Sequence, residues 1–425
     1  MLQEKASFRD PAGRIVVHNG VVRRVIAKEG MIDYCDLMES GLYMHLMMEG
    51  LLIPHKQIDA YTIEPQQIPF ISYPYEWPFD YLKESALNTL EINSIALKHN
   101  MILKDASAYN MQFFNGGMIL IDTLSFTKYE DGMPWMAYRQ FVQHFLAPLL
   151  LAKYRGPTSP QIDGIDPGLA FDLLPLKAKR LPVLLHLGLQ SMSGKVNSNK
   201  PVKMPKRNLI ALMDNLTNYI SRLEYKPKAG WKDYQECSYI ALAKLSKWNI
   251  VDGMLSDLPY GTLCDVGANV GEFTQLALSY GQSAMAIERD YSAANELSKN
   301  LPYCLCLVQD ICEPSPAIGW VNEERKSFLD RWHPDTIMAL ALIHHICIGN
   351  NVPLKMVAEL FAGHCNHLII EFVPAGDPMS VKIAGSKVYP AYSQEIFESE
   401  FSKHFKILRK ENIEDSCRTV YFMSQ

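Results

Sequence analysis

Apolar runs and amphipathic segments alternate through the second half of the chain. Short, continuous apolar runs, typical of strands buried on both faces of a sheet, occupy 263–266, 284–288, 304–308, 335–342 and 367–372. Two further runs follow at 405–408 and 418–423. Because helical patterns separate these runs, the second half predicts an open α/β sheet.

The first half has a different pattern. Asn19-Gly20 stands between two β-branched runs, which predicts a β-hairpin over 14–26 with a type I′ turn. Apolar periodicity predicts an amphipathic helix over 80–100. A further helix is expected over 31–49, with short strands at 61–63 and 70–73. This half therefore predicts an α+β domain.

The two patterns meet at a segment that is typical of a linker, Lys226-Pro227-Lys228-Ala229-Gly230. We expect a first domain over 1–225, a linker over 226–238 and a second domain over 239–425. A chain of 425 residues is long enough for two such domains.

Composition is typical of a globular protein, with 48% hydrophobic and 20% charged residues. A net charge of -5 makes nucleic acid an unlikely partner. No apolar run has the length of a membrane span, and the N-terminus lacks the apolar core of a signal peptide. The nine cysteines are scattered, and several fall in apolar runs. This pattern favours reduced, buried thiols and a cytoplasmic location.

A glycine-containing turn follows the first of the C-terminal strands. Its pattern is Asp265-x-Gly267-x-x-x-Gly271, directly before a helix. Gly267 can adopt angles closed to other residues, and Gly271 is expected to let the helix pack closely on the strand. A dinucleotide site would need G-x-G-x-x-G, and a carboxylate would repel a pyrophosphate there. The carboxylate of Asp265 instead suits a cationic amino group.

The turn resembles motif I (D/E-x-G-x-G-x-G) of the class I S-adenosylmethionine (SAM)-dependent methyltransferases, with Asn269 at the middle glycine. The resemblance covers about 231–425 and implies a Rossmann-like sheet of seven strands, the last antiparallel. It further implies that Glu288 accepts hydrogen bonds from the ribose and that Asp310 contacts the adenine amino group. The expected SAM-binding residues are Asp265, Gly267, Ala268, Asn269, Gly271, Glu288, Asp310, Ile311 and Leu340.

His344 and His345 follow the fourth C-terminal strand, where the family's substrates meet the methyl group. Methyl transfer needs an aligned nucleophile and a group that removes its proton, and histidine can accept a proton near neutral pH. His345 is the favoured base, and at least one of the pair is expected to pack under the turn. Glu371 and Asp377, after the fifth strand, either face the substrate or cap the loop. No zinc-ligand spacing is present, so we expect no metal site.

In the first half, Asp105 and Asn110 are spaced as in the kinase loop H-R-D-L-x-x-x-N, and Asp122 follows an apolar run as the Asp of D-F-G does. Residues 7–225 thus resemble a protein-kinase-like or aminoglycoside-phosphotransferase-like domain. The resemblance implies that Asp105 holds a substrate hydroxyl and that Asn110 and Asp122 bind magnesium with ATP. No glycine-rich phosphate loop is present, and only Arg24 or Lys28 could replace the phosphate-binding lysine. These departures favour a degenerate kinase-like domain.

The pattern of the whole chain resembles a bacterial NoeA-like family of class I methyltransferases. We therefore expect a SAM-dependent methyltransferase that acts on a small-molecule or glycan-type acceptor, with an N-terminal kinase-like domain that positions the substrate. One alternative is a bifunctional kinase-methyltransferase acting on a saccharide or its phosphate. The other is a scaffold without catalytic activity.

Overall fold

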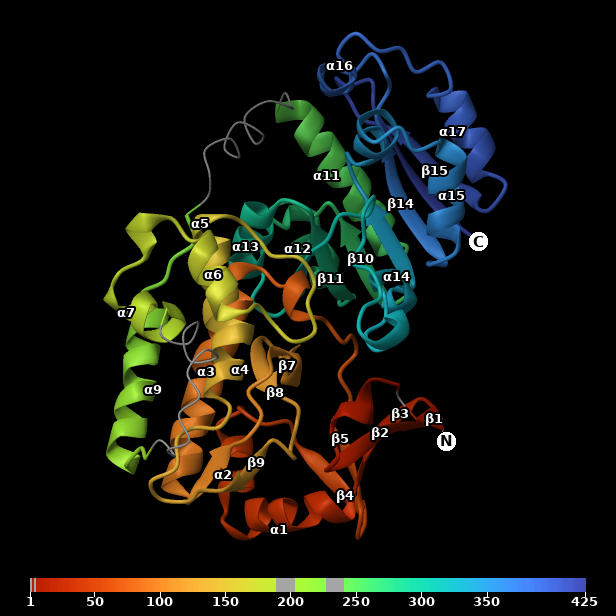
Figure 1. Ribbon diagram of the computed structural model, residues 1–425. Helices are drawn as coiled ribbons and strands as arrows, with labels where there is room; N and C mark the ends of the chain where they lie inside the picture. The colour runs from red at the N-terminus through yellow and green to blue at the C-terminus, as the bar shows by residue number, and fades with distance from the viewer. Residues whose placement is uncertain (1, 4, 189–202, 227–240) are drawn as a thin grey trace. The chain divides into compact units, whose positions relative to one another are not determined.

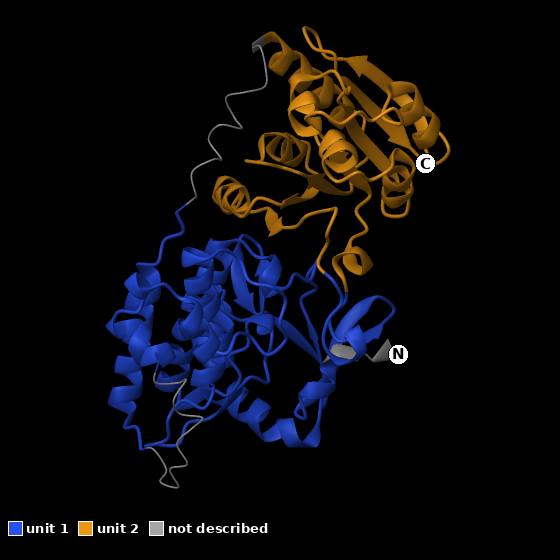
Figure 2. Ribbon diagram, turned by 45° about the horizontal axis from the view of Figure 1, so that its top comes forward, with its two compact units in different colours: residues 1–226, 316–326 blue, residues 227–315, 327–425 orange. Residues whose placement is uncertain are grey.

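The computed structural model describes residues 2–3, 5–188, 203–226 and 241–425. The chain forms two compact units (Figure 2). Unit 1 comprises Met1–Lys226 and Pro316–Lys326, and unit 2 comprises Pro227–Ser315 and Ser327–Gln425. The expected linker, 226–238, lies outside the described residues except for Lys226.

The segment 316–326 departs from the expected boundaries, because it lies within 239–425 in sequence but belongs to unit 1. Its contacts explain this placement. Arg9 forms an ion pair with Glu324, the guanidinium of Arg325 lies 4.7 Å from the ring centroid of Tyr109, and the Lys326 amide donates to the Tyr73 hydroxyl at 3.2 Å. Such contacts between residues distant in sequence leave no periodic signal.

Unit 1 begins with a five-stranded sheet of order β1-β2-β3-β5-β4. The predicted hairpin is confirmed as β2–β3, and Asn19 and Gly20 have φ of 50° and 78°, as a type I′ turn requires. The helix expected over 31–49 is two helices, because Gly41 has φ of 76° between them. These elements are β1 (Leu2–Gln3), β2 (Gly13–His18), β3 (Val21–Ile26), α1 (Met31–Glu39), α2 (Leu42–Met48), β4 (His55–Asp59) and β5 (Thr62–Pro65).

The rest of unit 1 is built around the helix α3 (Phe79–Lys98), close to its predicted bounds. Two small antiparallel pairs follow, β6 with β9 and, between them in the chain, the hairpin of β7 with β8. A group of helices completes the unit (Figure 1). The elements are β6 (Met101–Leu103), β7 (Met111–Phe114), β8 (Gly117–Leu120), β9 (Phe126–Lys128), α4 (Tyr138–Phe141), α5 (Ala147–Tyr154), α6 (Pro167–Leu173), α7 (Leu181–Val183) and α9 (Lys206–Ser221).

Unit 2 is a mixed α/β sheet of seven strands in the order β12-β11-β10-β13-β14-β16-β15. β16 runs antiparallel to both neighbours, and the other pairings are parallel. The strands are β10 (Thr262–Val266), β11 (Ser283–Glu288), β12 (Leu305–Val308), β13 (Thr336–Ala339), β14 (His367–Phe372), β15 (Lys406–Asn412) and β16 (Thr419–Ser424). The helices are α11 (Ala241–Ser256), α12 (Glu272–Ser279), α13 (Tyr291–Asn300), α14 (Phe328–Arg331), α15 (Leu354–Ala362), α16 (Pro378–Ala384) and α17 (Gln394–Phe401).

Successive side chains of the strands in unit 2 point to opposite faces of the sheet, and both faces are buried. The helices α11 and α15 lie on opposite sides of the sheet (Figure 1). One core joins α11 and α12 to the sheet through residues such as Val251, Leu263 and Ile369. By the two-residue period of a strand, Asp265 and Glu371 point to that same side. The strand order changes direction between β10 and β13, which is where open α/β sheets bind ligands.

Within the described residues, no helix combines the length and the apolar character needed to cross a bilayer.

Candidate functional site

The turn after β10 adopts the backbone that its sequence predicts. Gly267, Asn269 and Gly271 have φ of 78°, 52° and 90°, and asparagine is one of the few residues besides glycine that tolerates this region. Gly271 has a different neighbour from the one expected. A side chain there would meet Leu297 and Leu301 at 2.7 and 2.6 Å, so Gly271 makes room for α13 and the residue after it rather than for β10.

Glu288, at the end of β11, is joined to this turn. Its carboxylate accepts the Asn269 amide at 3.0 Å and the Asp290 amide at 2.8 Å. Burial raises the pKa of Glu288, and these two amides oppose the rise. The side-chain oxygen of Asn269 is buried and has no hydrogen-bond partner within the described part of the chain. The turn therefore presents an unused acceptor, and Glu288 keeps further lone pairs, which together fit a ligand with hydroxyl and amine donors.

Asp265 lies beneath the turn and is only 3% exposed. The hydroxyl of Thr274, on α12, donates to its carboxylate at 2.6 Å. Burial raises the pKa of Asp265 to about 7, against the lowering effects of Thr274 and Lys247. Sequence reasoning missed Thr274, which the helix periodicity alone does not distinguish from a core residue.

Asp310, Ile311 and Leu340 lie beyond the carboxyl ends of β12 and β13. The Asp310 carboxylate accepts the Cys312 amide at 2.9 Å and lies 3.6 Å from the guanidinium of Arg289. Ile311 and Leu340 are nearly buried, so they can supply apolar surface at this edge of the sheet. All the expected cofactor residues thus fall at one edge of the sheet, around the change of strand order.

His344 and His345 follow β13, with ring centroids 4.3 Å apart. His344 is buried, and its Nδ1 lacks a hydrogen-bond partner among the residues that the structure describes. His345 is partly exposed and begins a π-helical turn, His345–Gly349, a feature that often marks functional sites. Burial lowers the pKa of both rings, that of His344 to about 3, so both are neutral at pH 7.

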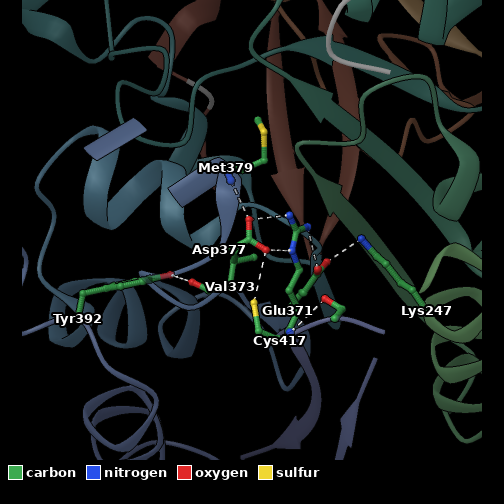
Figure 3. Close-up of polar contacts among 9 residues, drawn as sticks. Lys247, Glu371, Val373, Asp377, Met379, Tyr392 and Cys417 are labelled. Atoms are coloured by element: carbon green, nitrogen blue, oxygen red, sulfur yellow. Dashed lines mark hydrogen bonds and ion pairs between the residues drawn. The ribbon is translucent and has the colours of Figure 1, made fainter. Parts of the chain in front are cut away.

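A buried network of charges lies at the ends of β14 and β16 (Figure 3). Lys247 of α11 lies 2.6 Å from Glu371, and Arg418 lies 3.3 Å from the other oxygen of Glu371. Arg418 also binds Asp377 at 2.7 Å, while Asp377 caps α16 through the Met379 amide. Burial opposes ionisation of Asp377, but Arg418 and that amide hold its pKa below its usual value. The sequence indicated the two acids, but not Lys247 or Arg418.

In unit 1, the three kinase-like residues come together. The Asn110 amide group donates to the Ser125 hydroxyl at 3.3 Å, and Ser125 donates to Asp122 at 2.8 Å. Burial, then the neighbouring Asp122, raises the pKa of Asp105, whereas a hydrogen bond with Asn110 lowers it. Of the two candidate cations, Arg24 lies 2.5 Å from Asp122 and Lys28 is exposed. Within the described ranges, no three His, Cys, Asp or Glu side chains are arranged to hold a metal ion.

Unit 2 thus has the architecture of a doubly wound α/β protein, a class that binds ligands at the carboxyl edge of its sheet. The chain is 28% identical over 461 residues to nodulation protein NoeA of Rhizobium meliloti (strain 1021), and the match covers 98% of this chain and 94% of that protein. The chain is a homologue of NoeA over nearly its full length, which confirms the resemblance expected from the sequence. No family model matches the chain.

Among solved structures, the bifunctional kinase-methyltransferase WbdD matches 46% of this chain and 42% of its own, with 13% identity and a TM-score of 0.32. Magnesium protoporphyrin IX methyltransferase of Synechocystis PCC 6803 matches 46% and 90%, with 14% identity and a TM-score of 0.31. The N-methyltransferase NodS of Bradyrhizobium japonicum WM9 matches 43% and 96%, with 8% identity and a TM-score of 0.33.

Proposed function

We propose that unit 2 is a SAM-dependent methyltransferase. The observation that carries the proposal is the pairing of Glu288 with the left-handed turn at Asn269, at the point where the strand order reverses. Two hydroxyls of a ribose can donate to one carboxylate, and the residue at the end of the second strand is suited to receive them. The orphan oxygen of Asn269 adds an acceptor beside that position.

The remaining residues would divide the other contacts with the cofactor. Asp265, when ionised, would attract the amino group of the methionine part, and Asp310 would accept a hydrogen bond from the adenine amino group. Ile311 and Leu340 would pack against the adenine ring. When bound, SAM supplies a methyl group on a positively charged sulfur.

His345 would act on the acceptor. Its neutral ring can take the proton that the attacking atom loses, and its partial exposure leaves it accessible. His344, behind it, would fix the position of the His345 ring through their contact. Because both rings are neutral at pH 7, they would not repel the positive charge of the sulfonium.

We further propose that the acceptor is a small molecule or a saccharide, and that unit 1, as a kinase-like domain, positions it. The homology to a nodulation protein covers both units, which supports a function in which both take part. The net charge of -5 supports an acceptor other than nucleic acid.

Calorimetry with SAM tests the cofactor assignment. Wild-type protein should bind SAM, and Glu288→Gln, which keeps one acceptor oxygen for the backbone, should bind at least about tenfold more weakly because it loses a charge-assisted hydrogen bond. Glu296→Gln, an exposed change on α13 that removes the same charge, is the matched control and should bind as the wild type does. Folded wild-type protein that binds no SAM would overturn the proposal.

A further inference from the structure

Unit 1 gathers the residues that the kinase resemblance assigns to magnesium, yet both carboxylate oxygens of Asp122 are already engaged. One oxygen of Asp122 receives the Leu124 amide at 2.8 Å and Arg24 at 2.5 Å, and the other receives the Ser125 hydroxyl at 2.8 Å. A magnesium ion needs carboxylate oxygens at about 2.0–2.1 Å in octahedral geometry, so it would have to displace these donors.

Arg24 supplies a cation in the same place. The two terminal nitrogens of its guanidinium bind two different carboxylates, Asp122 and Asp10, each at 2.5 Å. The Arg24 and Asp122 side chains are each only 12% exposed. A planar fork with separate donors can bridge two carboxylates, which a lysine ammonium does less well. The Nε of Arg24 is buried and has no hydrogen-bond partner in the described chain, so the two acids orient the guanidinium.

Asp105 is held in the same way. Its Oδ1 accepts the Ser107 amide at 2.9 Å and the side-chain nitrogen of Gln140 at 2.7 Å. Gln140 in turn accepts the Ala106 amide at 2.8 Å, which fixes its orientation. Lys104, next to Asp105, is paired with Asp33 at 2.5 Å and is directed to α1 rather than to a phosphate.

We propose that Arg24 occupies the cation position of the Asp105–Asn110–Asp122 cluster. Its guanidinium blocks this site, so unit 1 binds neither Mg²⁺ nor metal-bound ATP there. The guanidinium and a divalent ion would share one carboxylate and repel each other. Unit 1 therefore keeps the framework of a phosphate-transfer site but uses it as a structural joint between the five-stranded sheet, through β3, and the loop before β9.

Manganese, which is a paramagnetic substitute for magnesium, provides the direct test on the full chain by electron paramagnetic resonance. Wild-type protein should have no Mn²⁺ site that depends on the Asp122 carboxylate, so Asp122→Asn should not reduce Mn²⁺ binding. Arg24→Met frees Asp10 and Asp122 and should bind Mn²⁺ at least about tenfold more tightly than wild type, since two unpaired acids favour a cation. A stoichiometric wild-type site that is lost in Asp122→Asn, or a folded Arg24→Met protein with no gain, would overturn the proposal.

Thermal unfolding gives a second measurement that does not depend on activity. Arg24→Met should lower the midpoint, and Mn²⁺ should raise it again in that variant only. Arg23→Met is the matched control, because Arg23 directly precedes Arg24 on β3 and pairs with Glu64 at 2.8 Å on a more exposed surface. Neither Mn²⁺ nor Mg²⁺ with ATP should move the midpoint of the wild type; an upward shift that Asp122→Asn abolishes would contradict the proposal. If Arg24→Met fails to fold, the comparison of wild type with Asp122→Asn still decides.

Discussion

The ammonium nitrogen of Lys247 lies 2.6 Å from the carboxylate of Glu371, and both side chains are almost completely buried. This ion pair joins α11 to the end of β14. Lys247→Met should lower the free energy of unfolding by about 3 kcal/mol, because it removes the shorter of the two ion pairs of a buried carboxylate. Urea denaturation measures the loss.

Two variants separate the pair from a general effect on α11. Lys244→Met lies on the same helix and breaks an exposed pair with Glu272, which should cost less than about 1 kcal/mol. Lys247→Met combined with Glu371→Leu removes both charges and should recover most of the stability that the single change loses. A single Lys247→Met variant as stable as Lys244→Met would contradict this view of the network.

The affinity for SAM should depend on pH through Asp265. Burial raises the pKa of this acid to about 7, so it is largely protonated at pH 6 and ionised at pH 8. Only the ionised form attracts an ammonium group, so the dissociation constant should fall roughly tenfold between pH 6 and pH 8 and then level off. Calorimetry over this range measures the effect. Asp265→Asn should bind weakly at every pH, and a wild-type affinity that does not change with pH would refute the assignment.

The same raised pKa predicts a stability effect in the protein without SAM. The folded state holds a proton on Asp265 that the unfolded state, with a pKa of about 3.9, releases. Stability from this group is therefore present below about pH 4 and is lost as pH rises toward 7.

Thr274→Val removes the donor that favours ionisation of Asp265 and should move the pH dependence of SAM binding to higher pH, whereas Thr274→Ser should leave it in place.

The sequence predicted those parts of the fold that depend on local pattern. The seven apolar runs of the second half are the strands of unit 2, and Asn19-Gly20 set the type I′ hairpin. The turn at Asn269 was also predictable, because few residue types tolerate its backbone. Each of these features depends on residues that are neighbours in the sequence.

The features that were missed depend on partners distant in sequence. The strand expected at 70–73 does not form, because Gln112 bonds both the amide and the carbonyl of Ser72 and takes the place of a neighbouring strand. In the sequence, Lys247 does not differ from other charged helix residues, because its partner Glu371 lies on β14, far along the chain. Arg24 was one of two candidate cations, and only the packing of β3 against Asp122 distinguished it from Lys28.

The close approach of α13 to Gly271 predicts an unusually costly glycine substitution. Gly271→Ala adds a methyl group within 2.7 Å of two leucine side chains, both buried, and strains a residue with φ of 90°. The free energy of unfolding should fall by about 2–3 kcal/mol. Gly281→Ala is the matched control, since its φ is 77° but no atom lies near the added group, so it should lose only about 1 kcal/mol. Equal losses in urea denaturation would show that α13 does not restrict this position.

His345 provides the prediction that separates chemistry from binding. His345→Ala should lower turnover by about 10²-fold or more while the affinity for SAM changes little, because the ring acts on the acceptor rather than on the cofactor. Turnover is measured as formation of S-adenosylhomocysteine with a panel of saccharide and small-molecule acceptors. Burial lowers the pKa of His345, so the neutral base persists into mild acid and the midpoint of the fall in kcat/KM should lie below that of an ordinary histidine. His404→Ala, an exposed histidine of the same unit, should match the wild type. Unchanged turnover in His345→Ala would reject its role as the base.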